Sequence, residues 1–371
     1  MRLGAILAVA VVCSVLAGCG NSPSSSNSGD LFVATQGDSL VSTFGVNLTD
    51  GSLSASSSKV ATGSAPSAMA VVPSGSAAFV ANSQCVNGGT VCNSVSRYTV
   101  NSDGTLAAVS GVQAVGTDPV ALAVDAAGKL LFVANRGSNN ISVFTIQSGT
   151  TLTEAAGSPF PTGASPVALA VAPSGNYLYV ANNLAGTVSV YAVDSSGVLS
   201  VVPGSPFTGV TSITPAGVTT TPKGDFVFVS NSGSNNVSVF AACIAVSSLC
   251  PTADGSLVEV TDSPFTAGVS PGPLAVESSG NFLYVVDTLS DQISGFRIST
   301  ASGALTPISP PTVSTGAGPV SIAIHPDGLW LYTANFAAAT ITYFGIDTTS
   351  GALAPHSPIP TGGQPAALGI R

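Results

Sequence analysis

The sequence contains very little charge. Only 7% of its 371 residues are charged, and its 8 Lys and Arg residues nowhere form a cluster. Nucleic acid and anionic membrane surfaces both require a basic patch, so we expect neither as a partner. The formal net charge is −9, while hydrophobic residues make up 45% of the chain. Disordered chains combine low hydrophobicity with high charge, so this composition indicates a folded protein.

The sequence also lacks helical periodicity and the common catalytic motifs. No segment repeats apolar residues at helical spacing over three turns. The chain has no phosphate-binding Gly-rich loop, no His-Glu-x-x-His zinc motif and no nucleophile elbow. Serine is abundant, but a serine without an activating base is a weak nucleophile. These absences argue against helical folds and against enzymes that depend on such motifs.

What the sequence does contain is an internal repeat. An aromatic residue opens a short Val- and Asn-rich segment seven times, at intervals of roughly 50 residues. These residues are Phe32, Phe79, Phe132, Tyr179, Phe228, Tyr284 and Tyr332. A proline lies thirteen residues before each of the last six, at Pro66, Pro119, Pro166, Pro215, Pro271 and Pro319. Pro365 has no aromatic after it and Phe32 has no proline before it, so the two ends of the repeat complement each other.

Each repeat contains four short runs of β-branched or aromatic residues separated by Gly, Pro, Ser and Asn turns. In one unit the runs are 166–171, 177–182, 188–193 and 198–201. Such runs predict strands, here called a to d from the centre outward. Seven four-stranded units predict an all-β fold, a seven-bladed β-propeller over residues 31–371. We expect Pro365 to Ile370 to supply strand a of the first blade and so to close the ring, which removes exposed sheet edges.

Aromatic residues also end strand c in every unit. They are Phe44, Tyr98, Phe144, Tyr191, Phe240, Phe296 and Phe344, and we expect them to pack between blades. The segments 132–144 and 179–182 resemble the YVTN-type propeller repeat of bacterial surface proteins. The recurring Ser-Pro-Phe at 158–160, 205–207 and 263–265 is similar to that of lactonase-like propellers, which include 6-phosphogluconolactonase-like proteins. The resemblance covers residues 31–371 and implies lactone hydrolysis as the activity of an enzyme with this fold.

The N-terminus has the features of a bacterial lipoprotein signal. Arg2 precedes an uncharged apolar run that is too short to span a bilayer. The run ends in Leu16-Ala17-Gly18-Cys19, which resembles a lipobox. We therefore expect residues 1–18 to be removed, Cys19 to be lipidated, and residues 19–30 to form a flexible Ser-rich tether. This predicts a lipid-anchored protein of the cell envelope, outside the cytoplasm.

The remaining cysteines form two pairs with equal spacing. Cys85 and Cys92 lie in one of the two longest repeats, and Cys243 and Cys250 lie in the other. Each pair therefore sits in an insertion, where a disulfide would stabilise the loop in an oxidising compartment. Zinc binding by the cysteines is the alternative to a disulfide, but no His lies near either pair.

Candidate site residues lie where the loops d–a and b–c converge, at the mouth of the ring. Asp118 begins a strand a and Arg136 follows the adjacent strand b, so antiparallel pairing should bring them together. They could converge on a ligand or form a rim salt bridge worth about 0–1 kcal/mol. Asp118, Arg136 and Asp287 are the catalytic candidates. The ligand-binding candidates on the same face are Gln36, Asp38, Asp291 and Gln364.

Several other polar residues have a structural interpretation. Asn82, Asn135, Asn182, Asn231 and Asn335 recur at the end of strand b, where Asn commonly closes a turn onto its own backbone. Asp287 interrupts this series of asparagines and is therefore its most interesting member. His325 occupies a variable turn position, and His356 lies in strand d or a loop. Arg97 and Arg297 are expected at partly solvated outer positions of strand c.

Two functions remain open. The favoured one is a binding scaffold for a small molecule or an envelope protein, which we expect to be a monomer attached to the membrane only through its lipid. The alternative is a hydrolase that opens a sugar lactone, with an Asp as base and Arg136 as electrophile. Because Arg136 is the only cation on the mouth face, a 6-phosphorylated substrate is disfavoured. We expect no metal and no cofactor, although the carboxylates offer oxygen ligands for Ca²⁺ as an alternative.

Overall fold

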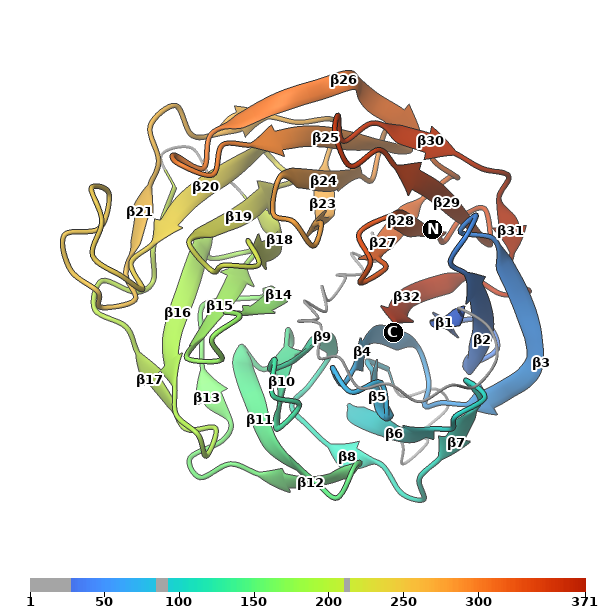
Figure 1. Cartoon of the computed structure of the whole chain (residues 1–371). Helices are drawn as coiled ribbons and strands as arrows, with labels where there is room; N and C mark the ends of the chain where they lie inside the picture. Colours follow the sequence, from blue (N-terminus) through green and yellow to red (C-terminus); the bar gives the residue numbers. More distant parts are fainter. Residues whose placement is uncertain (1–27, 85–92, 210–213) are drawn as a thin grey trace, which may run out of the picture.

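The computed structural model describes residues 28–84, 93–209 and 214–371, which form seven antiparallel sheets arranged in a ring (Figure 1). Blade 1 comprises β1 (Ser28–Thr35), β2 (Leu40–Asn47), β3 (Leu53–Ala61) and β32 (Pro365–Ile370). Blade 2 comprises β4 (Pro66–Val71), β5 (Ala77–Asn82), β6 (Ser94–Val100), β7 (Leu106–Ala108) and β8 (Gln113–Ala114). Blade 3 comprises β9 (Pro119–Val124), β10 (Leu130–Asn135), β11 (Asn140–Gln147), β12 (Thr151–Glu154) and β13 (Phe160–Pro161). Blade 4 comprises β14 (Pro166–Val171), β15 (Tyr177–Asn182), β16 (Thr187–Val193) and β17 (Leu199–Val201).

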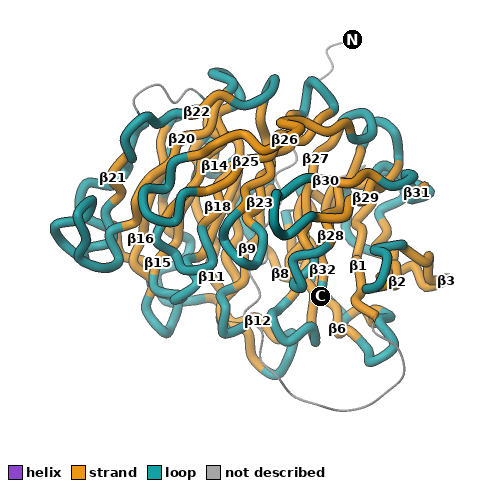
Figure 2. The backbone as a smooth tube through the Cα atoms, turned by 45° about the horizontal axis from the view of Figure 1, so that its top comes forward, coloured by secondary structure: helices purple, strands orange, loops and turns teal. Residues whose placement is uncertain are grey.

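The remaining blades continue the same order. Blade 5 comprises β18 (Pro215–Thr220), β19 (Phe226–Asn231), β20 (Asn236–Ala242), β21 (Leu257–Glu259) and β22 (Phe265–Thr266). Blade 6 comprises β23 (Pro271–Val276), β24 (Phe282–Asp287), β25 (Gln292–Ile298) and β26 (Leu305–Ser314). Blade 7 comprises β27 (Pro319–Ile324), β28 (Trp330–Asn335), β29 (Thr340–Ile346), β30 (Leu353–Pro355) and β31 (Ile359–Pro360). The described residues contain no helix, and hence none long and apolar enough to cross a membrane (Figure 2).

The ring closes as the unpaired ends of the repeat predict. β32 pairs antiparallel with β1, with Leu31 opposite Ile370 and Val33 opposite Leu368. The inner strands then contact one another in a complete circle, from β4 through β9, β14, β18, β23 and β27 to β32 and back to β4. The seven-bladed propeller and its closure by a C-terminal strand are therefore confirmed.

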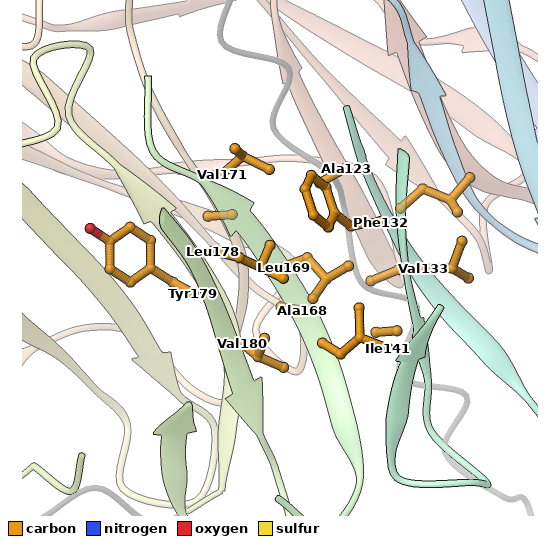
Figure 3. Close-up of a cluster of buried hydrophobic side chains, with 14 of the residues drawn as sticks. Ala123, Phe132, Val133, Ile141, Ala168, Leu169, Val171, Leu178, Tyr179 and Val180 are labelled. Carbon is orange, nitrogen blue, oxygen red and sulfur yellow. The ribbon is translucent and has the colours of Figure 1, made fainter. Parts of the chain in front are cut away.

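The hydrophobic core lies between neighbouring blades. The two inner strands of a blade are packed on both faces, so strands such as β14 and β18 are buried at every position. This explains why strand a is a continuous apolar run such as Pro166–Val171 rather than an alternating one. Figure 3 shows the contact between blades 3 and 4, where Phe132 and Ile141 face Leu169.

The aromatic residues of strands b and c join the blades, as expected. All seven strand b aromatics have no exposed surface, and all seven strand c aromatics are buried. Several tyrosine hydroxyls also donate to backbone carbonyls of an adjacent blade. Tyr98 donates to Ala61 at 2.9 Å, and Tyr332 donates to Gly51 at 3.0 Å across the junction between blades 7 and 1.

The outer strand d differs from its expected form. We expected a single short run, but β3 and β26 extend along most of the neighbouring strand c, with a register shift midway. In blades 2, 3, 5 and 7 the same edge consists of two short strands, the second pairing with the beginning of strand c. Outer strands contribute few core residues, so their extent is weakly determined by hydrophobic pattern.

One of the two predicted disulfides lies within the described residues. Cys243 and Cys250 are bonded, and both are buried beside the outer part of blade 5. Cys85 and Cys92 fall outside the described residues, as do Cys19 and the whole of residues 1–27.

Candidate functional site

Seven equivalent backbone hydrogen bonds surround one end of the ring. In each blade the residue before the strand a proline accepts a hydrogen bond from the backbone N–H of the residue after strand b. We call these fourteen residues the mouth ring. Its seven pairs are Ala65 and Ser83, Asp118 and Arg136, Ser165 and Asn183, Thr214 and Ser232, Ser270 and Thr288, Gly318 and Phe336, and Gln364 and Gln36.

Asp118 and Arg136 are the only charged members of the mouth ring. Arg136 Nε donates to Asp118 Oδ2 at 2.7 Å, and each side chain is 31% exposed. The backbone N–H of Arg136 also donates to the carbonyl of Asp118 at 2.9 Å, so the pair is fixed at two points. In the described part of the chain, Asp118 Oδ1 and the two terminal guanidinium nitrogens of Arg136 have no other protein partner. The predicted convergence of these two residues is therefore present, with donors and an acceptor left for a ligand.

The two glutamines are also members of the mouth ring. The backbone N–H of Gln36 donates to the carbonyl of Gln364 at 2.9 Å, and the Gln364 side chain is exposed. Gln36 Nε2 donates to the carbonyl of Pro66 in blade 2 at 3.2 Å. Both residues lie at the mouth as predicted, although the amide of Gln36 joins blades 1 and 2.

Asp38 and Asp291 lie in the b–c loops, two and three residues after the mouth-ring members Gln36 and Thr288, and bond within the fold. Asp38 accepts a hydrogen bond from the hydroxyl of Thr35. Asp291 Oδ1 accepts from the backbone N–H of Gly318 at 2.8 Å. Asn139 and Asn235 accept from the next blade in the same way, so the contact of Asp291 belongs to the repeat.

Asp287 does not join the other two catalytic candidates. It lies in blade 6, whereas Asp118 and Arg136 lie in blade 3, and its side chain has no exposed surface. Its carboxylate accepts from Ser294 Oγ at 2.7 Å and from the backbone N–H of Gly268 at 3.1 Å. Burial raises the pKa of Asp287 to about 6, and these hydrogen bonds only partly offset that effect.

The repeated asparagines are structural, but their partners differ from those we expected. Each Nδ2 donates across the b–c hairpin to side chains of strand c rather than closing a turn on its own backbone. Asn135, for example, donates to Asn140 Oδ1 at 2.8 Å and to Ser142 Oγ at 2.9 Å. Asn182 makes the equivalent bonds to Thr187 and Ser189. This correction follows from cross-strand pairing, which places the hydroxyl two residues into strand c directly beside the amide.

The histidines lie away from the mouth. His325 is buried in the a–b turn of blade 7, with Nδ1 3.0 Å from Asp327 Oδ1. His356 stacks on Tyr343 with ring centroids 4.6 Å apart on the outer part of the same blade. Within residues 28–84, 93–209 and 214–371, no three His, Cys, Asp or Glu residues gather in a way that could hold a metal ion.

The sequence analysis did not identify Asn183, the mouth-ring residue of blade 4 that carries a side-chain amide. Asn183 occupies the position in blade 4 that Arg136 occupies in blade 3, and its Nδ2 donates to the carbonyl of Pro215 at 2.9 Å. The signal was available, because both residues directly follow an asparagine of the repeated series. Aligning that position across all blades would have identified the whole mouth ring.

A comparison with protein families gives a match over nearly all of the ring. The model described as "Lactonase, 7-bladed beta-propeller" matches residues 52–164, 148–255 and 243–367. A comparison with curated proteins gives no significant match.

Solved structures show the same fold at low sequence identity. A candidate 6-phosphogluconolactonase of Bacteroides fragilis is 20% identical with a TM-score of 0.79, covering 94% of this chain and 100% of that one. The periplasmic gluconolactonase of Pseudomonas aeruginosa is 21% identical with a TM-score of 0.78, covering 93% and 99% of the two chains. A streptogramin B lyase is more distant, at 14% identity and a TM-score of 0.54, covering 82% and 87%.

Proposed function

The chain belongs to the lactonase family of seven-bladed β-propellers, and from this premise we propose that it opens a sugar lactone at the mouth ring. The observation that carries the proposal is the ion pair of Asp118 and Arg136, the single charged pair among fourteen ring positions. Lactone hydrolysis requires a base to activate water and a cationic donor for the oxygen that becomes negative. These two side chains supply both groups at one point of the ring.

The proposed reaction is a direct addition of water. The Asp118 carboxylate takes a proton from water as the hydroxide oxygen bonds to the lactone carbonyl carbon. The terminal guanidinium nitrogens of Arg136 stabilise the oxyanion of the tetrahedral intermediate, as charge-assisted donors do. The ring C–O bond then breaks, the carbonyl reforms, and the departing alkoxide takes the proton back from Asp118. The product is a hydroxycarboxylic acid, which releases a proton to solvent to become a hydroxycarboxylate, and both residues return to their starting states.

The charge of the mouth favours a neutral substrate. A phosphoryl group is recognised by several cations or a cluster of N–H donors, and Arg136 is the only cation in the mouth ring. The other ring side chains include the amides of Gln36, Gln364 and Asn183, which are suited to the hydroxyls of a sugar. We therefore propose an unphosphorylated sugar lactone rather than a 6-phosphorylated one.

We also propose that the protein works outside the cytoplasm, anchored through Cys19. Two features support this location: the lipobox-like Leu16-Ala17-Gly18-Cys19 and the disulfide between Cys243 and Cys250. Structural disulfides persist in oxidising compartments and are rare in the cytosol.

Initial rates of lactone opening test the proposed function. The purified protein would be given glucono-lactone and its 6-phosphate separately, and acid release would be followed, with the rate of a protein-free reaction subtracted. We expect catalysed opening of both lactones or of the neutral one alone, with the higher kcat/KM for the neutral lactone. No turnover above the protein-free rate on either lactone would reject the hydrolase and leave a binding scaffold as the function.

A further inference from the structure

A cavity lies on the outer side of the ring between blades 1 and 2, and no mouth-ring residue lines it. Its volume is about 490 Å³, within the range of small-molecule sites. The end of β3 and the two residues after it form one wall, and strands β6 and β7 with the following turn form the other. Ala61, Tyr98, Ala108, Val109 and Val112 make much of its lining apolar.

Blade 2 differs from blades 3, 4 and 5 in the segment that follows β7 and lines part of the cavity. Phe160, Phe207 and Phe265 pair with the start of strand c in blades 3, 4 and 5. The equivalent residue of blade 2 is Gln113, which pairs with Val95. In blades 3 and 4 the Phe ring packs against a turn glycine, with a Cβ on that glycine lying 3.4 or 3.2 Å from the ring.

The turn glycine of blade 2 has a different environment. At Gly111 the nearest atom to such a Cβ is a terminal nitrogen of Arg97, 3.9 Å away. The aromatic side chain that covers the equivalent turn in blades 3 and 4 is therefore replaced by open space and a guanidinium. Arg97 itself stands where blades 3, 4 and 5 have Val143, Val190 and Val239.

Among the described residues, Arg97 lines this cavity without a carboxylate partner. Its terminal nitrogens donate there to backbone carbonyls, those of Ser110 at 3.0 Å, Gly111 at 3.4 Å and Thr150 at 3.5 Å. Its Nε is buried and lacks any hydrogen-bond partner in the described part of the chain. A buried unsatisfied donor on a charged group is costly, and a negative charge beside the guanidinium offsets part of that cost.

The other polar side chains of the lining are already bonded. Thr62 and Ser96 both bond to Asn82, and Tyr98 donates to the carbonyl of Ala61. The groups of the cavity that can recognise a ligand are therefore the Arg97 guanidinium and the apolar side chains beside it. Guanidinium groups bind carboxylates through charge-assisted hydrogen bonds. Arg97 is the only cation among the lining residues, and the protein has a net charge of −9, so the cavity favours a monoanion over a phosphate dianion.

We propose that this cavity binds a small organic monocarboxylate, with its carboxylate on Arg97 and its apolar body against Tyr98, Val109 and Val112. The site is separate from the mouth ring and does not depend on the proposed lactone hydrolysis. It uses an arginine that the repeat does not require, because the equivalent positions in three other blades hold valine.

Binding of hexanoate, with neutral hexanamide as its matched control, tests this site. In a titration of methyl-labelled protein observed by NMR, hexanoate should shift the methyl resonances of Ala61, Val109 and Val112 with saturation. Hexanamide should bind about tenfold or more weakly, because it lacks the charge that Arg97 recognises. If the wild-type protein shows no saturable shifts at these methyls, or binds the two compounds with equal affinity, the proposal is overturned.

Two arginine variants sharpen the test. Arg97→Gln should weaken hexanoate binding about tenfold or more. Arg297→Gln is the matched control, because Arg297 also donates to a turn carbonyl of the next blade, that of Thr349 at 2.6 Å, but does not line the cavity. Equal hexanoate affinities for Arg97→Gln and Arg297→Gln, with both proteins folded by circular dichroism, would contradict the proposal.

Discussion

Arg136→Ala should lower kcat/KM for a neutral sugar lactone by about 10²–10³-fold, the usual loss when an oxyanion donor is removed. The guanidinium is the mouth-ring group that can stabilise the negative oxygen, and no second cation of the ring can replace it. Arg136→Lys should lose less activity, since it keeps the charge but not the planar pair of donors. Initial rates at low lactone concentration measure this directly.

Stability should change little in these variants. The ion pair with Asp118 is partly exposed on both sides, and such pairs contribute about 0–1 kcal/mol. Arg297→Ala provides the matched control, because Arg297 lies over the Phe282 ring at 4.6 Å in blade 6, away from the mouth ring. Wild-type activity in Arg136→Ala, or an equal loss in Arg297→Ala, would remove Arg136 from the proposed reaction.

Asp287→Asn should stabilise the protein at neutral pH by about 3 kcal/mol. Burial raises the pKa of Asp287 from 3.8 to about 6, and each pKa unit corresponds to about 1.4 kcal/mol. The native state therefore binds more protons than the unfolded state between about pH 4 and pH 6, so the contribution of Asp287 to stability falls as pH rises through this window. Asparagine occupies the equivalent position in five blades and carries no charge to bury.

Urea unfolding of the two proteins from pH 4 to pH 8 tests this effect. The difference in the free energy of unfolding between Asp287→Asn and wild type should grow from about pH 4 to pH 6 and then stay constant at higher pH. Exposed aspartates with lowered pKa values, such as Asp50 and Asp194, affect both proteins equally and cancel in the difference. Asn182→Asp is the reciprocal control and should lose stability above the same window. Parallel stability curves for wild type and Asp287→Asn would show that Asp287 is not the titrating group.

The fold was predictable because each blade corresponds to one copy of a sequence repeat. The spacing from Pro66 to Phe79 recurs in six units, and the unmatched Pro365 and Phe32 indicate ring closure by β32. Burial on both faces makes the inner strands continuous apolar runs, which are easy to recognise. The outer strands are shorter, more polar and more exposed, so the extents of β3 and β26 were not evident.

The candidate site was predictable only in part. Asp118 and Arg136 meet because antiparallel pairing brings the ends of β9 and β10 together, which follows from their positions in the repeat. We expected the Asp287 side chain at the mouth, but successive strand residues point in opposite directions. The last residue of strand b faces its own hairpin, and the next residue reaches the mouth, where blade 6 has Thr288. The cavity at Arg97 lies between two blades and is lined by residues of β3, β6 and β7 that form no sequence motif.

The central claim is that Asp118 and Arg136 act together on a lactone at the mouth ring. A double-mutant cycle on kcat/KM tests it most directly, using Asp118→Asn, Arg136→Gln and the double variant with glucono-lactone. Residues that act as one catalytic unit give non-additive losses, so each single variant should fall close to the rate of the double variant. Full activity in the double variant would contradict the account, as would losses that multiply independently.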